Sequence, residues 1–292
     1  MTQPASQPAL SKFSINAYVM EYQPPFGLVL KQDLLSTDGI RGVHDHPSER
    51  VRLGLRHVGG PIKVQPGKAD LDALLPLITG SAKNGSHQFP LAETLSIPGA
   101  GGFSVIIDRV AAVFTYINCK VDTATFEAQS GSILDLTLGL EAFDETVAGS
   151  SPSNPSVAAP YVFMDGVFTL ASTAYQIKQF KLTIDNHLKK DRFMNTTTRA
   201  DLPFMDRTIR LECQVPYTSD ELGIYGTGIT AESVSLVFTN GTNVFTISSS
   251  GWQIEPMSPQ VQSKEEEILL PLQGFLRTVS GSGILTLQND PV

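Results

Sequence analysis

The sequence repeats itself at a spacing close to half its own length, and this repetition constrains the fold more than any other feature. Residues 62–65 (Ile-Lys-Val-Gln) match residues 209–212 (Ile-Arg-Leu-Glu) in character, at an offset of 209 − 62 = 147. Residues 30–32 match residues 177–179 at the same offset. Matches that share one offset predict two copies of one structural unit.

A second group of matches lies further along the chain and has a smaller offset. Residues 119–122 (Cys-Lys-Val-Asp) resemble residues 252–255 (Trp-Gln-Ile-Glu), 252 − 119 = 133 positions later. The apolar alternation that begins at Leu134 resembles the one that begins at Ile268, at an offset of 134. The first copy therefore carries 147 − 133 = 14 extra residues, most naturally in the Gly- and Ser-rich residues 81–102, which are expected to form a loop.

The predicted boundary between the two copies is a low-complexity segment. Residues 148–160 (AGSSPSNPSVAAP) are rich in Ser, Pro and Ala, a composition typical of linkers. The 292 residues are enough for two domains of about 150 residues each. We therefore predict an N-terminal domain over residues 1–147, a linker over residues 148–160 and a C-terminal duplicate over residues 161–292.

Short runs of β-branched and aromatic residues, bounded by Gly, Pro, Asn and Asp, predict a mainly β fold. The run from Tyr175 to Asp185 alternates as a strand does, with one irregular step. One helix is predicted over residues 68–78, where apolar residues recur at i, i+3, i+4 and i+7 and Gly80 follows. The other predicted strands are residues 50–55, 61–65, 103–107, 110–116, 120–127, 133–140, 208–215, 233–239, 243–248 and 268–275.

The charge balance of the chain disfavours a protein that binds nucleic acid through its phosphates. Lys plus Arg total 21 against 29 Asp plus Glu, a net charge of −8, whereas binding through phosphates needs an excess of cations. Cys119 and Cys213 are too few for a disulfide scaffold, and we expect both to be buried thiols. The N-terminus lacks the features of a signal peptide, and no apolar run approaches the roughly 20 residues of a membrane helix. We therefore expect a protein that is made in a cytoplasm and stays there at first, and that has no membrane-spanning segment.

No motif predicts catalysis, a metal site or a cofactor. His44, Asp45 and His46, with His57 further along, could bind a divalent ion, but the surrounding Gly and Pro residues and the absence of matching ligands in the second copy favour a polar loop. Residues 226–231 fit a dinucleotide-binding pattern only formally, because a strand-like run and not a helix follows them. We therefore expect no catalytic residue, no metal and no cofactor.

Two stretches of the chain resemble the tail tube (major tail) proteins of tailed bacteriophages, in the form with a duplicated domain. Residues 116–122 (YINCKVD), followed by Phe126 and Ser130-Gly131, are similar to the family's segment that leads into an alternating strand and a Gly-containing turn. Residues 160–163 (PYVF) and 177–186 (IKQFKLTIDN) are similar to its central stretch. The resemblance implies two tandem β-sandwich or small-barrel domains, each with at most one short flanking helix, in a structural subunit that performs no chemistry.

The resemblance also implies an assembly. Subunits of the family join their sheet edges into closed rings, which leaves no unpaired edge, and the rings stack into the tube through which double-stranded DNA leaves the capsid. Two similar domains per chain predict a trimeric ring with pseudo-sixfold symmetry. The implied partners are other copies of the chain, a tape measure protein that sets the tube length, tail terminator and baseplate proteins, and DNA that passes without specific binding. The implied location is the virion tail, after assembly in the bacterial host cytoplasm.

Two alternative functions remain open at this point. One is a different tail component of the same fold, such as a baseplate, connector or secretion-tube protein, and filaments of indefinite length would favour the tube subunit over it. The other is a carbohydrate-binding β-sandwich, which would need a cluster of exposed aromatic rings. The chain has one tryptophan, Trp252, and it lies in a strand-like segment.

Two sets of charged residues are candidates for the functional surfaces. The polar segments 38–50 and 186–207 occupy corresponding places in the two copies, and we predict that they join stacked rings through complementary charges; the candidates are His44, Asp45, Arg50, Lys189, Lys190, Asp191 and Arg192. DNA carries one negative charge per about 1.7 Å of its axis, so a channel that lets it pass should be acidic or neutral. The candidates for that wall are acidic residues of matched strands and turns: Asp122, Glu127, Asp135, Glu255, Glu265, Glu266 and Glu267.

Overall fold

The computed structural model describes residues 8–24, 27–36, 48–80, 88–91, 102–155, 158–193, 195–218, 231–255, 257–259, 261, 267–279 and 283–291. Strands dominate this part of the chain, so the predicted mainly β class is confirmed. The strands are β1 (Lys12–Ile15), β2 (Tyr18–Met20), β3 (Val29–Ser36), β4 (Val51–Val64), β5 (Gln88–Leu91), β6 (Phe103–Asp108), β7 (Val113–Gln129), β8 (Asp135–Ala142), β9 (Asp144–Val147), β10 (Gly166–Leu170), β11 (Thr173–Tyr175), β12 (Gln179–Asp185), β13 (Thr208–Pro216), β14 (Ala231–Asn240), β15 (Asn243–Glu255), β16 (Leu269–Leu276) and β17 (Leu285–Pro291). The helices are α1 (Lys68–Thr79) and the 3-10 turns η1 (Pro8–Leu10), η2 (Ser48–Arg50) and η3 (Phe163–Asp165).

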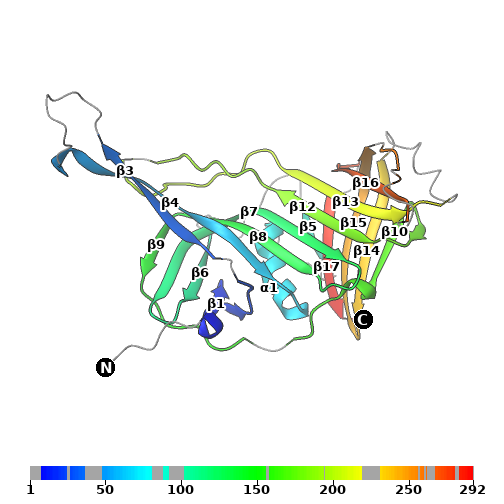
Figure 1. The fold of residues 1–292 in the computed structure, drawn as a ribbon, viewed down its shortest axis with the longest axis horizontal. Helices are drawn as coiled ribbons and strands as arrows, with labels where there is room; N and C mark the ends of the chain where they lie inside the picture. Colours follow the sequence, from blue (N-terminus) through cyan, green and yellow to red (C-terminus); the bar gives the residue numbers. More distant parts are fainter. Residues whose placement is uncertain are drawn as a thin grey trace.

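In the first half of the chain, antiparallel strands lie side by side in the order β3, β4, β8, β7 and β6 (Figure 1). The hairpin of β1 and β2 continues beyond β6, and β9 pairs with the first part of β7. The alternation expected from the sequence decides which way the side chains point. In β8, Leu136, Leu138 and Leu140 are buried, while the residues between them are partly exposed.

The second half uses the same kind of antiparallel sheet, in the order β12, β13, β16, β15 and β14. Strands β10 and β11 continue beyond β14. The first part of β15 pairs with β17, and β17 pairs in turn with β5, a strand that comes from the first half of the chain.

The two halves share strands and one core. Strand β12 pairs with β7 along its whole length, so the sheet runs without a break from the first half into the second. Helix α1 buries Leu71, Leu74, Leu75 and Ile78, the apolar stripe that the sequence predicted, within a cluster of buried residues that extends over both halves. Asn289 of β17 donates to the Lys68 carbonyl and to Asp72, which fastens the helix to the second half.

Several local expectations change in the structure. The strands predicted at residues 110–116 and 120–127 are parts of a single long strand, β7. The run predicted as one strand over residues 175–185 is interrupted, because β11 ends at Tyr175 and β12 begins at Gln179. The predicted loop over residues 81–102 contains β5, where Phe89 is fully buried and pairs with β17. The apolar side chain of Phe89 explains why this part of the Gly- and Ser-rich segment forms a strand.

Candidate assembly surfaces

A hairpin made of β3 and the first part of β4 projects from one end of the molecule (Figure 1). We refer to its described residues 32–36 and 48–55 as the arm. Leu34, Leu35 and Leu53 of the arm are 67%, 60% and 64% exposed, and Val51 and Leu55 are also exposed. Apolar side chains gathered at one exposed place on a protein mark a contact with another molecule. The arm is therefore a candidate assembly surface.

A second extended segment, residues 186–207, joins β12 to β13 and runs back over the first half of the chain (Figure 1). We refer to it as the crossing segment. The Arg56 amide of β4 donates to the Thr197 carbonyl at 2.7 Å, and the Asn186 side-chain amide donates to the Val121 carbonyl at 3.0 Å. Leu188 and Leu202 are buried. Unlike the arm, the crossing segment has its apolar side chains packed within the chain.

Charged groups hold the crossing segment to the strand ends beneath it. The Arg199 guanidinium lies 2.6 Å from a Glu141 carboxylate oxygen and donates to the carbonyls of Val58 and Ala142 at 3.2 and 3.1 Å. The Lys190 ammonium lies 2.7 Å from Asp122 and 2.9 Å from Glu141. Burial alone would lower the pKa of Lys190, but its hydrogen bonds with Asp122 and Glu141 raise that pKa above the usual value. Lys190 is thus engaged within its own chain.

The other residues predicted to join stacked rings occupy different surroundings. His44 and Asp45 lie outside the described residues. Arg50 is exposed in η2 on the arm. Lys189 and Asp191 form an exposed ion pair at 3.1 Å, and Arg192 lies 3.7 Å from Asp201.

His57, the most distant member of the histidine cluster, is occupied by other groups. Its ring packs edge-on against Phe193 and lies within hydrogen-bond distance of Arg199. Within the described ranges, no three His, Cys, Asp or Glu side chains gather as a metal site would require.

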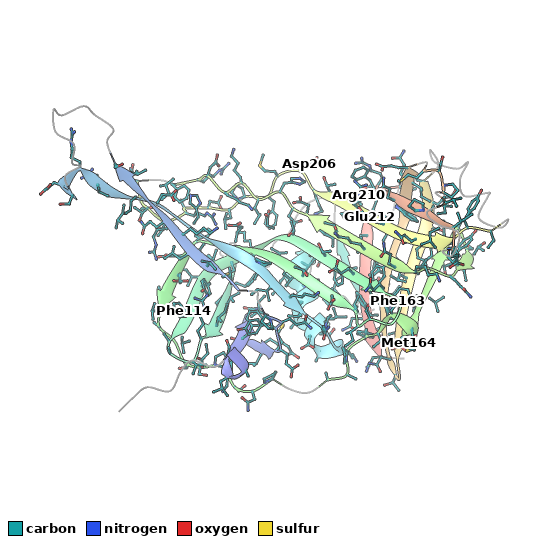
Figure 2. The ribbon with its side chains drawn as sticks, in the orientation of Figure 1. Phe114, Phe163, Met164, Asp206, Arg210 and Glu212 are labelled. Carbon is teal, nitrogen blue, oxygen red and sulfur yellow. The ribbon has the colours of Figure 1, made fainter. Side chains whose placement is uncertain are left out.

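One row of polar side chains, five of them charged, crosses the polar face of the sheet, with one residue from each of six neighbouring strands. Each member is the direct cross-strand partner of the next in the antiparallel register. We refer to this set as the charged row, and its members in spatial order are Asp135, Glu127, Lys181, Glu212, Gln273 and Glu255. Figure 2 labels Glu212 on β13, with Arg210 two residues before it on the same strand.

The rows on either side of the charged row are uncharged over most of their length. On one side, Gln129, Gln179 and Gln214 are direct partners. On the other side the row reads Thr137, Thr125, Thr183, Arg210, Phe275 and Gln253. The opposite face of the same strands is apolar and buried, as at Phe126, Leu182 and Leu211. This sheet therefore has one polar face, on which the charged row lies between two mostly neutral rows, and one apolar face that is buried.

Three of the predicted channel residues, Glu127, Asp135 and Glu255, belong to the charged row. Asp135 also lies 2.9 Å from Lys63, and Glu255 accepts a hydrogen bond from Gln273 at 2.9 Å.

The other predicted channel residues are placed elsewhere. Asp122 lies under Lys190, and Glu267 pairs with Lys178 at 2.9 Å. Glu265 and Glu266 lie outside the described residues.

Lys181 and Glu212 were not predicted as site residues. Their alternation along the strands is visible in the sequence, but their place in the row depends on which strands become neighbours. The register of β12 against β7 and β13 decides that.

Other features bear on the alternative functions. Trp252 is fully buried, so its ring is not available to stack on a sugar. Cys119 and Cys213 are buried free thiols, as expected, and burial raises the pKa of both. No helix in the part of the chain that the structure describes is long and apolar enough to cross a membrane.

A comparison with protein families finds a match over most of the chain. The family described as phage tail tube protein matches residues 28–275, which include the arm, the crossing segment and every member of the charged row. No curated protein is similar enough to the chain to match it. Because the family match spans most of the sequence, the chain belongs to the phage tail tube protein family.

Proposed function

We propose that this structural tail tube subunit forms trimeric rings with pseudo-sixfold symmetry, and that the rings stack into the conduit for double-stranded DNA. The observation that carries the proposal is the repeated strand order. The first half reads β3, β4, β8, β7, β6 and the second half reads β12, β13, β16, β15, β14. Two halves with one strand order support the duplicated domain, and three such chains supply six similar positions around an axis.

The pairing register supports the same duplication. Val121 pairs with Leu140 in the first half, and Ile254 pairs with Gly274 in the second. The offsets, 254 − 121 = 133 and 274 − 140 = 134, are those of the sequence repeat.

The register of β4 favours a different offset from the sequence comparison. Ile62 pairs with Leu138, and the counterpart of Leu138 at an offset of 134 is Leu272, which pairs with Cys213. The offset for β4 is then 213 − 62 = 151 and not 147. The difference is an even number of residues, so both alignments keep the same side chains on the buried face.

We propose that the polar face of the sheet is the channel wall. The charged row holds four carboxylates and one lysine, and the glutamines and threonines beside it are neutral. The two cations beside it, Arg210 and Lys63, are paired with Glu212 at 2.8 Å and Asp135 at 2.9 Å. A wall of this composition repels the DNA phosphates weakly and offers few cations to hold them. The candidates Asp122, Glu265, Glu266 and Glu267, which lie apart from the charged row or outside the described residues, remain proposals for the channel.

We propose that stacked rings meet through the outer end of the arm and the exposed part of the crossing segment. Arg50, Lys189, Asp191 and Arg192 are exposed charges suited to such contacts, and His44 and Asp45 belong to the same proposal. Tape measure, tail terminator and baseplate proteins are the proposed further partners. Assembly in the host cytoplasm is proposed with them.

Electron microscopy and native mass spectrometry of the purified protein test the proposal together. We expect tubes or stacked rings, with isolated rings that contain three chains of 31.5 kDa. Rings of six chains would contradict the trimer, and the absence of any ring or tube would contradict the function.

A charge reversal tests the stacking contacts separately. Lys189→Glu combined with Arg192→Glu should leave single rings soluble and prevent stacking, while Lys12→Glu on β1 should leave tubes intact. Normal tubes from the double variant would contradict the assignment.

A further inference from the structure

Strand β3 occupies the place in the first half that β12 occupies in the second, but it lacks one of the two neighbours that β12 has. Strand β12 pairs with β13 on one side and with β7 on the other. Among the described strands, β3 pairs with β4 alone. Within the described ranges, the other edge of β3 is therefore free, and its backbone donors and acceptors can pair with another strand.

The register identifies which residues correspond in the two strands. Leu30 pairs with Val58, and the counterpart of Val58 at an offset of 151 is Ile209, which pairs with Ile184. Leu30 thus corresponds to Ile184 at an offset of 184 − 30 = 154, and not to Ile177 as the sequence repeat at an offset of 147 had it. Two residues later in the chain, Gln32 corresponds to Asn186, which directly follows β12, and both positions carry a carboxamide.

Within the chain, Asn186 directly follows β12 and bonds to β7. Its backbone amide donates to the Asp122 carbonyl at 2.8 Å, and its side chain donates to the Val121 carbonyl. At an offset of 133, the counterparts of Val121 and Asp122 are Ile254 and Glu255 at the end of β15.

The end of β15 is the corresponding place in the second half. Ile254 and Glu255 pair with β16 on one side. On the other side, the described part of β14 reaches only to Gln253, the partner of Ala231. Within the described residues nothing pairs with Ile254 and Glu255 on that side, and the residues that precede Ala231 lie outside the described ranges.

The exposed side chains of the arm agree with the correspondence between β3 and β12. The crossing segment, which follows β12, buries Leu188 and Leu202, whose backbone groups bond to Asp122 and Lys120 of β7. Its Arg199 reaches the ends of β4 and β8. The arm, which contains the end of β3, occupies the corresponding part of the first half, yet its Leu34, Leu35 and Leu53 are more than half exposed. The matching strand ends in the second half are those of β13, β15 and β16.

The surface at those strand ends offers an aromatic ring to the arm. Phe275 of β16 is partly exposed, and the guanidinium carbons of Arg210 and Arg277 lie 5.6 and 5.2 Å from the centre of its ring. Arginine side chains keep apolar stems beside an aromatic ring, so this surface can bury leucine side chains.

We propose that the junction between the two halves of the chain is repeated between chains: β3 of one copy pairs with the end of β15 in a second copy, with Gln32 beside Ile254 and Glu255. The arm then covers the ends of β13, β15 and β16 of that second copy. The contact is head-to-tail, because β3 and β15 lie at opposite ends of the molecule (Figure 1). The proposal rests on the proposed ring and names the residues that close it.

A cysteine cross-link tests this junction. Cross-strand neighbours have Cβ atoms about 4.5–5.5 Å apart, within reach of a disulfide or a short bis-maleimide. The variant Gln32→Cys with Glu255→Cys, oxidised after assembly, should run on a denaturing gel as covalent dimers and trimers. Each single variant should run as a monomer, and so should the control Lys12→Cys with Glu255→Cys. The native thiols are buried and give no background.

Each outcome has a distinct meaning when microscopy accompanies the gel. Rings together with cross-linked dimers and trimers support both the junction and the proposed function. Rings without a cross-link overturn the junction and leave the proposed function standing. Cross-links from Gln32→Cys alone overturn the head-to-tail geometry. Neither rings nor cross-links overturn both proposals, whereas cross-links without rings support the junction and count against the tube.

A second variant tests the arm without new cysteines. Leu34→Ser with Leu53→Ser removes apolar area only from the exposed arm and should weaken association between chains at least tenfold by analytical ultracentrifugation. Val167→Ser, on β10, is the control because Val167 is also an exposed apolar residue, and it should leave association unchanged. Equal association of all three proteins would overturn the role of the arm.

Discussion

Arg199 places a buried positive charge between the crossing segment and the strands of the first half. Its side chain is 2% exposed and has Glu141 and two backbone carbonyls as partners. Removing it leaves these buried acceptors without a donor, which costs more than the loss of an exposed ion pair.

We expect Arg199→Ala to lower the free energy of unfolding by about 3 kcal/mol. Arg199→Lys should recover only part of the loss, because one ammonium cannot reproduce the planar set of donors. The control is Arg192→Ala, whose exposed pair with Asp201 is worth less than about 0.5 kcal/mol. Urea unfolding measures all three, and equal losses for Arg199→Ala and Arg192→Ala would contradict the structural role.

The two buried thiols make the free energy of unfolding depend on pH in the alkaline range. Burial raises the pKa of Cys119 and Cys213 in the folded protein, whereas the unfolded thiols titrate near about 8.5. The stability that the protonated thiols contribute is therefore complete below pH 8.5 and is lost as the pH rises above it.

As the pH rises from 8.5 to 9.5, we expect each thiol to lower the free energy of unfolding by about 1 kcal/mol. Burial raises the pKa of Tyr161 to about 12, but its contribution starts to be lost only near pH 10, where an unfolded tyrosine titrates, so it adds little in this window. Urea unfolding across the window should show a smaller loss for Cys119→Ala with Cys213→Ala than for the original protein. Identical slopes would show that the thiols are not responsible.

At the scale of the elements, Gly274 allows β16 to approach β15 closely. A Cβ atom at this position would collide with the Gln253 carbonyl oxygen and lie 2.9 Å from the Ile254 Cα atom. Both are backbone atoms, so no side-chain rotation can relieve the contact.

Gly274→Ala should therefore open the β15–β16 ladder and destabilise the protein by about 3 kcal/mol. Gly241→Ala is the matched control, since its Cβ would meet open space and only the positive φ of 61° adds a cost of about 1 kcal/mol. Hydrogen exchange should show faster exchange at β15 and β16 in Gly274→Ala alone. Equal protection in both variants would argue against the close approach.

The sequence predicts elements well where one segment contains the whole signal. The apolar stripe of α1 and the alternation of β8 and β13 depend on neighbours in the chain, and the structure confirms them. Strand β5 was missed because four residues around Phe89 form a strand only when β17 lies beside them. The same limit applies to the candidate site, since Glu127 and Lys181 become neighbours only through the pairing of β7 with β12.

At the scale of the whole molecule, the charged row offers a direct test of the channel wall. Its four carboxylates and one lysine give a charge of −3 per chain, and Glu127→Lys with Glu212→Lys would change this to +1. We expect assembled tubes of that variant to retain duplex DNA in a gel shift at low salt, with binding that weakens steeply as salt rises. The original tubes should not retain it.

A control with the same change in net charge separates the wall from the outer surface. Glu21→Lys with Asp165→Lys changes two acids that lie outside the charged row, and tubes of this variant should release DNA as the original does. Equal retention by both variants would place the proposed wall elsewhere.

The pairing of β12 with β7 also bears on how assembly begins. In a ring built from six separate domains, every lateral contact would have to form between freely diffusing molecules. In the proposed ring, every second contact is the pairing of β12 with β7, which forms during folding at the high effective concentration of two segments on one chain. Only three contacts of that ring then depend on protein concentration, so a ring forms by the association of three chains and not of six separate domains. A chain of this design can remain dispersed while it is scarce and still close rings rapidly once it accumulates.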